Sequence, residues 1–175
     1  MVYSKNWRVK MINKKIENAL NKQINEEIFS AYLYLSMSAY FLSLNLEGSA
    51  VWMKAQAQEE MSHAMKFFNF LVEMGGRVSL LPVKEPEKTW KSPLAAFTAV
   101  SRHEQYITSC IDGLYRLAGS EKSNPTQIML QWFIKEQVEE EATAAKVVYR
   151  LTQIKDSVNG LWMLDKELGK RGTGA

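Results

Sequence analysis

One long segment without helical periodicity, residues 77–91, does most to limit how this chain can fold. It contains Pro82 and Pro86, and long helical patterns lie on both sides of it. About fifteen extended residues span roughly 50 Å, whereas a helix of about thirty residues measures roughly 45 Å. The segment is therefore long enough to cross a whole helix bundle, so that the helices on its two sides run parallel.

The rest of the chain carries apolar residues at helical spacing, interrupted by start and stop signals. Gly75-Gly76 is a typical helix end, and Ser92-Pro93 and Asn124-Pro125 are typical helix beginnings. Short turns within each half predict antiparallel pairs. We therefore expect an all-α fold, a four-helix bundle with one long crossover and a short fifth C-terminal helix. The expected helices cover about residues 13–41, the turn at Gly48 to 74, 93–118, 124–154 and 158–168.

The composition favours one soluble globular domain, because 46% of the residues are apolar and 23% are charged. The net charge is +3 and no dense basic block with interleaved aromatics occurs, so nucleic-acid binding is not expected. The lone cysteine, Cys110, excludes an internal disulfide and suits a reducing cytoplasm. No stretch has membrane-spanning length, and no membrane partner is expected. We expect residues 1–10 to be a disordered extension, residues 11–170 the domain, and residues 171–175 a flexible tail.

Each of the four long helices places a metal-capable side chain on its apolar stripe. On the first, Glu27 shares a face with Leu20 and Tyr34 at the 100° rotation per residue of a helix. All of these positions lie at mid-helix, where antiparallel neighbours bring them to a common level roughly 20 Å from each turn. The set comprises Glu27, then Glu60 with His63, then Glu104, and finally Gln137 with Glu140.

Bare carboxylates in such a core are costly, so they must either share protons at raised pKa values or be neutralised by cations. Four carboxylates with one imidazole match two divalent ions in charge. Glu60 is best placed to bridge them, because His63 follows at i+3 on its face. Oxygen ligands with a single histidine favour iron or manganese over calcium.

Four strings that carry these residues, NEEIFSAYLYLSMS, AQAQEEMSHAMKFF, HEQYIT and LQWFIKEQVEEE, resemble the non-haem ferritins of bacteria and archaea. The resemblance extends from residue 11 to about residue 170. It implies one iron bound by Glu27, Glu60 and His63, and a second by Glu60, Glu104 and Glu140 with Gln137 close by. It also implies a third iron site on Glu59, Glu136, Glu139 and Glu140, and aromatic neighbours at Tyr34 and Trp132, of which Tyr34 is a candidate electron donor.

The resemblance further implies a hollow shell of twenty-four identical subunits that oxidises Fe(II) with dioxygen and deposits ferric mineral inside. The short fifth helix would pack at its four-fold axes. Haem is not expected. Met61 stands where bacterioferritins place their haem-binding methionine, but Glu136 is followed at i+3 by Glu139 rather than by histidine.

Plainer interpretations stand beside these. A lone buried-face glutamate is usually partly solvated, the run from Glu139 to Glu141 is typical of a solvated helix face, and Tyr34 can be a packing residue with one hydrogen bond. His103 and Cys110 point away from the metal face. Three other functions remain: a nucleating subunit without oxidase activity, a rubrerythrin-like peroxide reductase without a shell, and a DNA-protecting miniferritin. The complete ligand set argues against the nucleating subunit, and the absence of a cysteine-rich segment argues against the peroxide reductase. The miniferritin is disfavoured because all the expected ligands fit inside one bundle.

Overall fold

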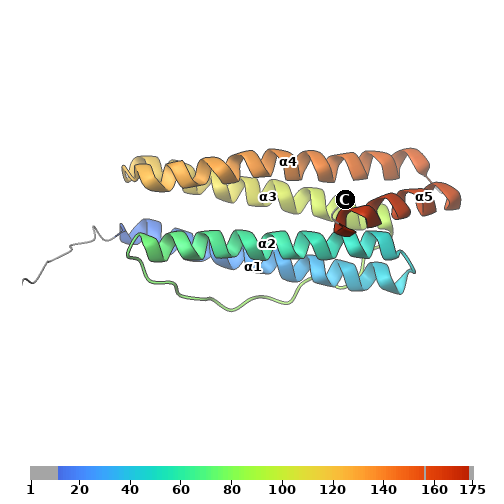
Figure 1. The fold of residues 1–175 in the computed structure, drawn as a ribbon, viewed down its shortest axis with the longest axis horizontal. Helices are drawn as coiled ribbons and strands as arrows, with labels where there is room; N and C mark the ends of the chain where they lie inside the picture. The colour runs from blue at the N-terminus through green and yellow to red at the C-terminus, as the bar shows by residue number, and fades with distance from the viewer. Residues whose placement is uncertain (1–11, 156, 174–175) are drawn as a thin grey trace, which may run out of the picture.

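The structure, a computed structural model, describes residues 12–155 and 157–173. All regular secondary structure in the described residues is helical, with no strand (Figure 1). This confirms the all-α prediction, and the helix bounds differ from the expected ones by at most about two residues. The elements are α1 (Lys14–Ser43), α2 (Glu47–Glu73), α3 (Pro93–Ser120), α4 (Asn124–Ile154), α5 (Val158–Leu168) and the 3-10 helix η1 (Gly169–Thr173).

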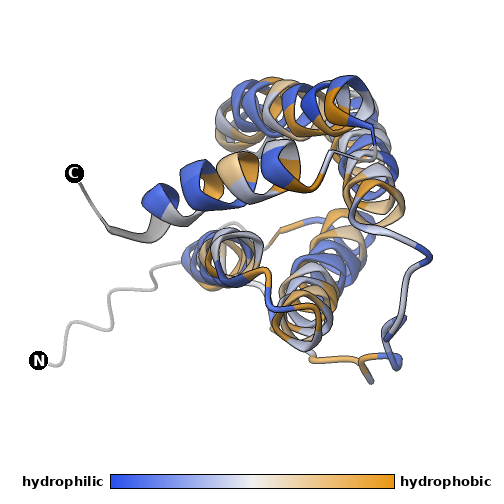
Figure 2. Cartoon of the chain, turned by 90° about the vertical axis from the view of Figure 1, so that its right-hand side faces the viewer, coloured by the Kyte–Doolittle hydropathy of each residue, from blue (hydrophilic) through white to orange (hydrophobic). Residues whose placement is uncertain are grey.

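The crossover runs along the length of the bundle, so α2 and α3 are parallel while α1–α2 and α3–α4 are antiparallel hairpins (Figure 1). Two polar side chains of α1 hold it. Asn21 Oδ1 accepts a hydrogen bond from the Ser79 backbone N–H at 2.7 Å, and Ser36 Oγ donates to the Glu87 carbonyl at 2.6 Å. In the end-on view, the crossover and α5 lie on opposite sides of the bundle (Figure 2).

The helix starts follow the sequence signals with one shift. Ser92 caps α3, where its hydroxyl accepts a hydrogen bond from the Ala95 N–H and Pro93 occupies the first turn. At α4 the capping position is Ser123, and Asn124 is already helical. Both residues belong to the types that favour this position, which is why the sequence placed the cap one residue late.

Two apolar clusters fill the bundle, one toward each end. The cluster that contains Phe41, Met53 and Phe97 also receives Leu164 of α5. The other contains Ile16, Leu71 and Leu130. Most of the buried ionisable side chains, which include Glu27, Glu60 and Glu104, come from mid-helix positions between these two clusters. The fold therefore encloses a polar layer between two hydrophobic ones.

The fifth helix is fixed to the start of α2 through the buried Asp165. Its carboxylate accepts hydrogen bonds from the backbone N–H groups of Gly48 at 2.9 Å and Ser49 at 2.7 Å, and from the Ser49 hydroxyl at 2.7 Å. A Cβ atom on Gly48 would lie 1.7 Å from the Asp165 carbonyl oxygen, so the close approach requires glycine.

The helical chain continues past the expected boundary at residue 170, because residues 169–173 form η1 against α2 where we expected part of a flexible tail. The expected N-terminal extension, residues 1–10, lies outside the described residues, as do residues 174–175. Within the described part of the chain, no helix combines the length and the apolar character needed to span a membrane.

Candidate metal centre

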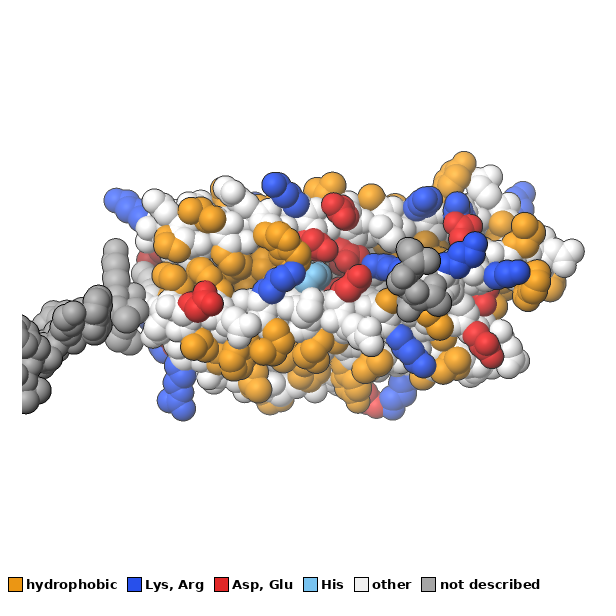
Figure 3. Space-filling view, in the orientation of Figure 1, with side chains coloured by type: hydrophobic (Ala, Val, Ile, Leu, Met, Phe, Trp, Pro, Cys, Tyr) orange, Lys and Arg blue, Asp and Glu red, His pale blue; other side chains and the backbone are white. Residues whose placement is uncertain are grey.

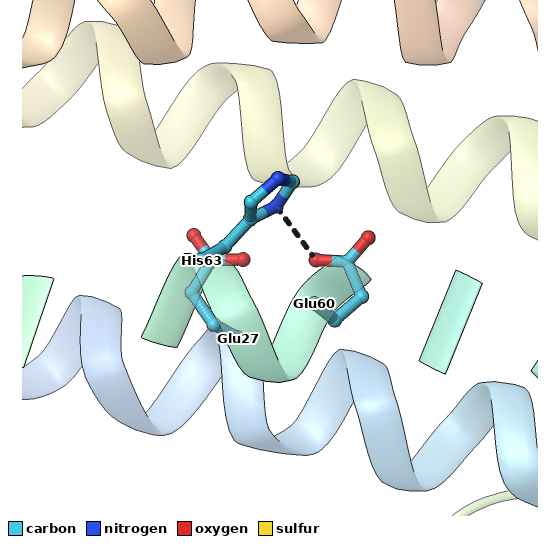
Figure 4. Close-up of side chains that lie close together, drawn as sticks. All are labelled: Glu27, Glu60 and His63. Carbon is cyan, nitrogen blue, oxygen red and sulfur yellow. Dashed lines mark ion pairs between the residues drawn. The ribbon is translucent and has the colours of Figure 1, made fainter. Parts of the chain in front are cut away.

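Three side chains from the first hairpin form a compact buried group. Ligand atoms of Glu27, Glu60 and His63 all lie within 4.8 Å of one another, with Glu27 on α1 and the other two on α2 (Figure 4). His63 Nδ1 is 3.4 Å from Glu60 Oε2. The structure thus brings together the residues expected to hold one iron. Iron binding by them stays a prediction.

Glu27 has one oxygen satisfied and one without a partner. Its Oε1 accepts a hydrogen bond from Gln23 Nε2 at 2.8 Å, while Oε2 is buried and has no hydrogen-bond partner. Burial, and then the charge of Glu60, raises the pKa of Glu27 well above its ordinary value. An unpartnered buried acceptor is rare and costly, and either a cation near Oε2 or a proton shared with the Glu60 carboxyl group would supply the missing interaction.

Glu104 of α3 is held at both oxygens. The Tyr34 hydroxyl donates to Oε1, and Gln137 Nε2 of α4 donates to Oε2 at 3.2 Å. Burial raises the pKa of Glu104. Burial and the Glu104 charge raise the pKa of Tyr34 well above its ordinary value, so this phenol stays protonated as a donor. Tyr34 and Gln137 therefore orient Glu104, while a redox role for Tyr34 stays a prediction.

Glu140 of α4 completes the polar layer. Its Oε2 accepts a hydrogen bond from Gln56 Nε2 at 2.9 Å, and burial followed by the charge of Glu104 raises the pKa of Glu140 to about 7. After burial, the charges of Glu104 and Glu140 help to raise the pKa of Glu60. The four carboxylates act on one another electrostatically, but only Glu27 and Glu60 lie in the compact group with His63.

Gln56 was missed in the sequence. It lies four residues before Glu60 on the same helix face, the spacing that Gln23 has to Glu27, and this repeated spacing could have identified it.

The three remaining residues of the expected third iron site lie outside the core. Glu59 and Glu139 are exposed and Glu136 is half-buried. Glu59 Oε2 accepts a hydrogen bond from Arg171 Nη2 at 2.7 Å. Acidic side chains gather with a histidine on the face between α2 and α4, and basic side chains lie beside them (Figure 3). The described residues show no compact group at Glu59, Glu136 and Glu139, so this site stays a prediction.

Aromatic rings enclose His63. The ring centroids of Trp132 and Phe133 lie 5.5 Å and 5.8 Å from that of His63, both edge-on, and Lys66 Nζ lies 3.2 Å from the Trp132 ring centroid. Trp132 thus flanks the group, as the resemblance implied.

The other histidine belongs to the packing. His103 Nε2 lies 2.7 Å from Ser30 Oγ, its ring meets Phe29 edge-on, and burial lowers the pKa of His103 to about 4. Neither His103 nor Cys110 belongs to the compact group, in agreement with the helix rotation.

Comparison with known proteins gives a consistent result. The family model described as a ferritin-like domain matches residues 17–170. The bacterial non-heme ferritin of Bacteroides fragilis is 40% identical over 161 residues, which cover 92% of this chain and 100% of that protein. The one from Campylobacter jejuni is 38% identical over 156 residues, 89% of this chain and 93% of that one. The open pore ferritin of Archaeoglobus fulgidus superposes with a TM-score of 0.90 at 51% identity, over 90% of this chain and 98% of that one.

Proposed function

This chain belongs to the ferritin family of iron-storage proteins, and from that premise we propose that it oxidises Fe(II) with dioxygen inside a single subunit and stores the ferric product. The observation that carries the proposal is the buried group of Glu27, Glu60 and His63. Its two carboxylates and one imidazole are ligands that suit Fe(II), and the unpartnered Glu27 oxygen lies within this group.

A second Fe(II) would bind between Glu60, Glu104 and Glu140. Two of these ligands are oriented by hydrogen bonds, since Tyr34 and Gln137 donate to Glu104 and Gln56 donates to Glu140, and the side-chain oxygen of Gln137 is itself a candidate ligand. Such outer hydrogen bonds fix the orientation of metal ligands. A third iron would bind at Glu59, Glu136, Glu139 and Glu140, on the rim of the same centre.

Two Fe(II) ions each give one electron, and dioxygen takes the pair together with two protons to form hydrogen peroxide. The protein supplies fixed metal spacing and anionic oxygen ligands that favour Fe(III) over Fe(II). Its buried carboxyl groups have raised pKa values, so they release protons when the substrate ions bind.

For storage, we propose a homo-oligomeric shell of twenty-four subunits in the cytoplasm, without haem, that encloses ferric mineral. Three side chains of α5 suit a subunit contact, because each exposes a large apolar surface in the single chain. They are Val158 at 80%, Trp162 at 65% and Met163 at 68% exposure.

A nucleating subunit without oxidase activity is the alternative within the family, and the structure argues against it. Surface carboxylates would suffice to nucleate mineral, whereas Glu27 and Glu60 are buried at 1% and 2% exposure. Cations that bind inside the bundle would offset the cost of burying these charges.

The test is a stepwise addition of Fe(II) in air to the metal-free protein, with the oxidation rate followed against iron added per chain. We expect a fast phase that saturates at about two to three irons per chain, as a site of fixed metal number requires. Glu60→Gln should abolish it. Glu73→Gln, an exposed glutamate near the end of α2, is the matched control and should retain it. A slow, non-saturating phase that is equal in all three proteins would refute the oxidase assignment.

A further inference from the structure

The C-terminal segment of the described chain lies along one face of α2. Asp165 binds the backbone at Gly48, and Gly169 packs so closely that a Cβ atom there would lie 3.1 Å from the Gly48 Cα atom. Further along, the Arg171 guanidinium lies 4.7 Å from the ring centroid of Trp52. The contacts thus advance from the first turn of α2 toward its middle.

The segment ends on one of the outer carboxylates. Arg171 Nη2 donates to Glu59 Oε2 at 2.7 Å, and Glu59 lies seven residues beyond Trp52, on the same side of α2. The Arg171 side chain is only 27% exposed, against 47% for Glu59, and its Nη1 is buried without a hydrogen-bond partner. This ion pair is therefore built into the fold on the Arg171 side, by Trp52 and by the anchor at Asp165.

The charge of the same guanidinium also acts on a carboxyl group at the edge of the buried layer. The Arg171 charge lowers the pKa of Glu140, whereas the charge of Glu59 raises it. Arg171 thus acts on two of the four carboxylates that are the expected ligands of a third iron, one outside the core and one at its boundary.

We propose that Arg171 is the resident cation of these outer carboxylates, and that a metal ion binds Glu59 only by displacing it. The proposal rests on the proposed function, in which Glu59 is a ligand of the third iron. A metal ion on Glu59 would stand within a few ångströms of the guanidinium, and like charges at that distance repel. Because η1 is tethered next to Glu59, the competitor is present at high effective concentration.

The competition would set the order in which the positions fill. The inner position of Glu27, Glu60 and His63 has no lysine or arginine to displace, since none of the ion pairs found among the described residues joins either type to Glu27 or Glu60. The outer position must first release Arg171. Arg171 therefore keeps the outer position weaker than the inner pair.

The experiment measures binding of Zn²⁺, which cannot be oxidised, to the metal-free assembled protein by titration calorimetry. Five proteins are compared: wild type, Arg171→Gln, Arg171→Lys, Arg150→Gln and Glu60→Gln. Arg150→Gln is the matched control, because it removes the same charge from an exposed ion pair, with Glu167 of α5, whose N–O distance is 2.5 Å. Glu60→Gln serves as the marker for the inner positions.

We expect Arg171→Gln to tighten the weakest Zn²⁺ site by about fivefold, the ratio that corresponds to the upper range for exposed ion pairs. Arg171→Lys and Arg150→Gln should stay near wild type, and added salt should narrow the difference. Unchanged or weaker Zn²⁺ binding in Arg171→Gln, or no outer site in any protein, would overturn the proposed competition between Arg171 and the metal ion. If Glu60→Gln loses Zn²⁺ sites in that case, the proposed function still stands. If Glu60→Gln removes no site, the proposed function itself fails.

Discussion

Glu59 and Glu60 are neighbours in α2, as Glu139 and Glu140 are in α4, yet the members of each pair meet opposite surroundings. Glu60 and Glu140 are buried at 2% and 6% exposure, whereas Glu59 and Glu139 are exposed. One residue turns a helix by about 100°, which carries a side chain from the core to the surface. A carboxylate inside the bundle is thus a costly charge that must be neutralised by cations or protons. The same group on the helix surface is solvated by water.

The largest difference is expected in the oxidation rate. Glu60→Gln removes the ligand that both inner positions are proposed to share, so the fast phase should slow by more than about 100-fold, beyond the range for outer hydrogen-bond partners. Glu59→Gln should slow it by less than about threefold, since exposed substitutions of this kind act weakly. The measurement is the initial rate of Fe(II) oxidation with two Fe(II) added per chain. Equal losses of rate in the two variants would contradict the distinction between inner and outer carboxylates.

The next difference concerns stability against pH in the metal-free protein. The folded-state pKa of Glu140 is raised to about 7 from 4.5, so the folded chain binds its proton more strongly than the unfolded chain. Its contribution is present below about pH 4.5 and is lost as the pH rises through about 7. Urea unfolding with a chelator should therefore show Glu140→Gln gaining up to about 3 kcal/mol over wild type across this window.

Glu139→Gln is the surface counterpart and should follow the wild-type pH profile within about 0.5 kcal/mol. The raised pKa values of Glu27, Glu60 and Glu104 act with the same sign, so wild type itself should lose stability toward neutral pH. A metal-free wild type that becomes more stable over this range would contradict the burial of these charges.

A smaller effect on the oxidation rate is expected when a hydrogen bond that orients Glu104 is removed. Tyr34→Phe removes the hydroxyl that donates to Glu104, and the fast oxidation phase should slow by roughly tenfold, as expected for an outer partner of a metal ligand. Tyr40→Phe is a suitable control, because Tyr40 packs against Trp90, with a ring-centroid distance of 5.2 Å, away from the centre. If both variants oxidise Fe(II) equally fast, Tyr34 does not hold Glu104 for this step.

The smallest expected effect is the free energy of coupling between the exposed Glu59 and its partner Arg171. A double-mutant cycle with Glu59→Gln and Arg171→Gln, followed by urea unfolding without metal, should give a coupling below about 1 kcal/mol that shrinks with added salt. Their side-chain exposures of 47% and 27% set this limit. A coupling of several kcal/mol would place this pair among the buried charges.

Much of the molecule follows from local patterns. Proline, glycine and the apolar spacing located five helices and the crossover, and the apolar stripes placed Glu27, Glu60, Glu104 and Glu140 in the core, where they are found. Periodicity works here because it reports which side of a helix faces inward.

What escaped prediction is the pairing of polar groups distant in sequence. Asp165 with Gly48, Gln56 with Glu140, and Arg171 with Glu59 join residues 84 to 117 positions apart. The spacing of Gln56 to Glu60 could single out Gln56, but no sequence pattern identifies Glu140 as its partner, because each of these pairs depends on how helices dock against one another. The glycine-rich segment beyond residue 170 is expected from its sequence to be flexible, and its contact with α2 depends on how α5 packs against the bundle.

The division of the centre between two hairpins also bears on the order in which it forms. Glu27, Glu60 and His63 all belong to the α1–α2 hairpin, which leaves the ribosome first and needs only local chain closure. Glu104 and Glu140 join only when the second hairpin docks across the crossover. Half of the centre can thus be complete while the chain is still being synthesised, and a cation bound there would stabilise the nascent hairpin before the rest of its fold exists.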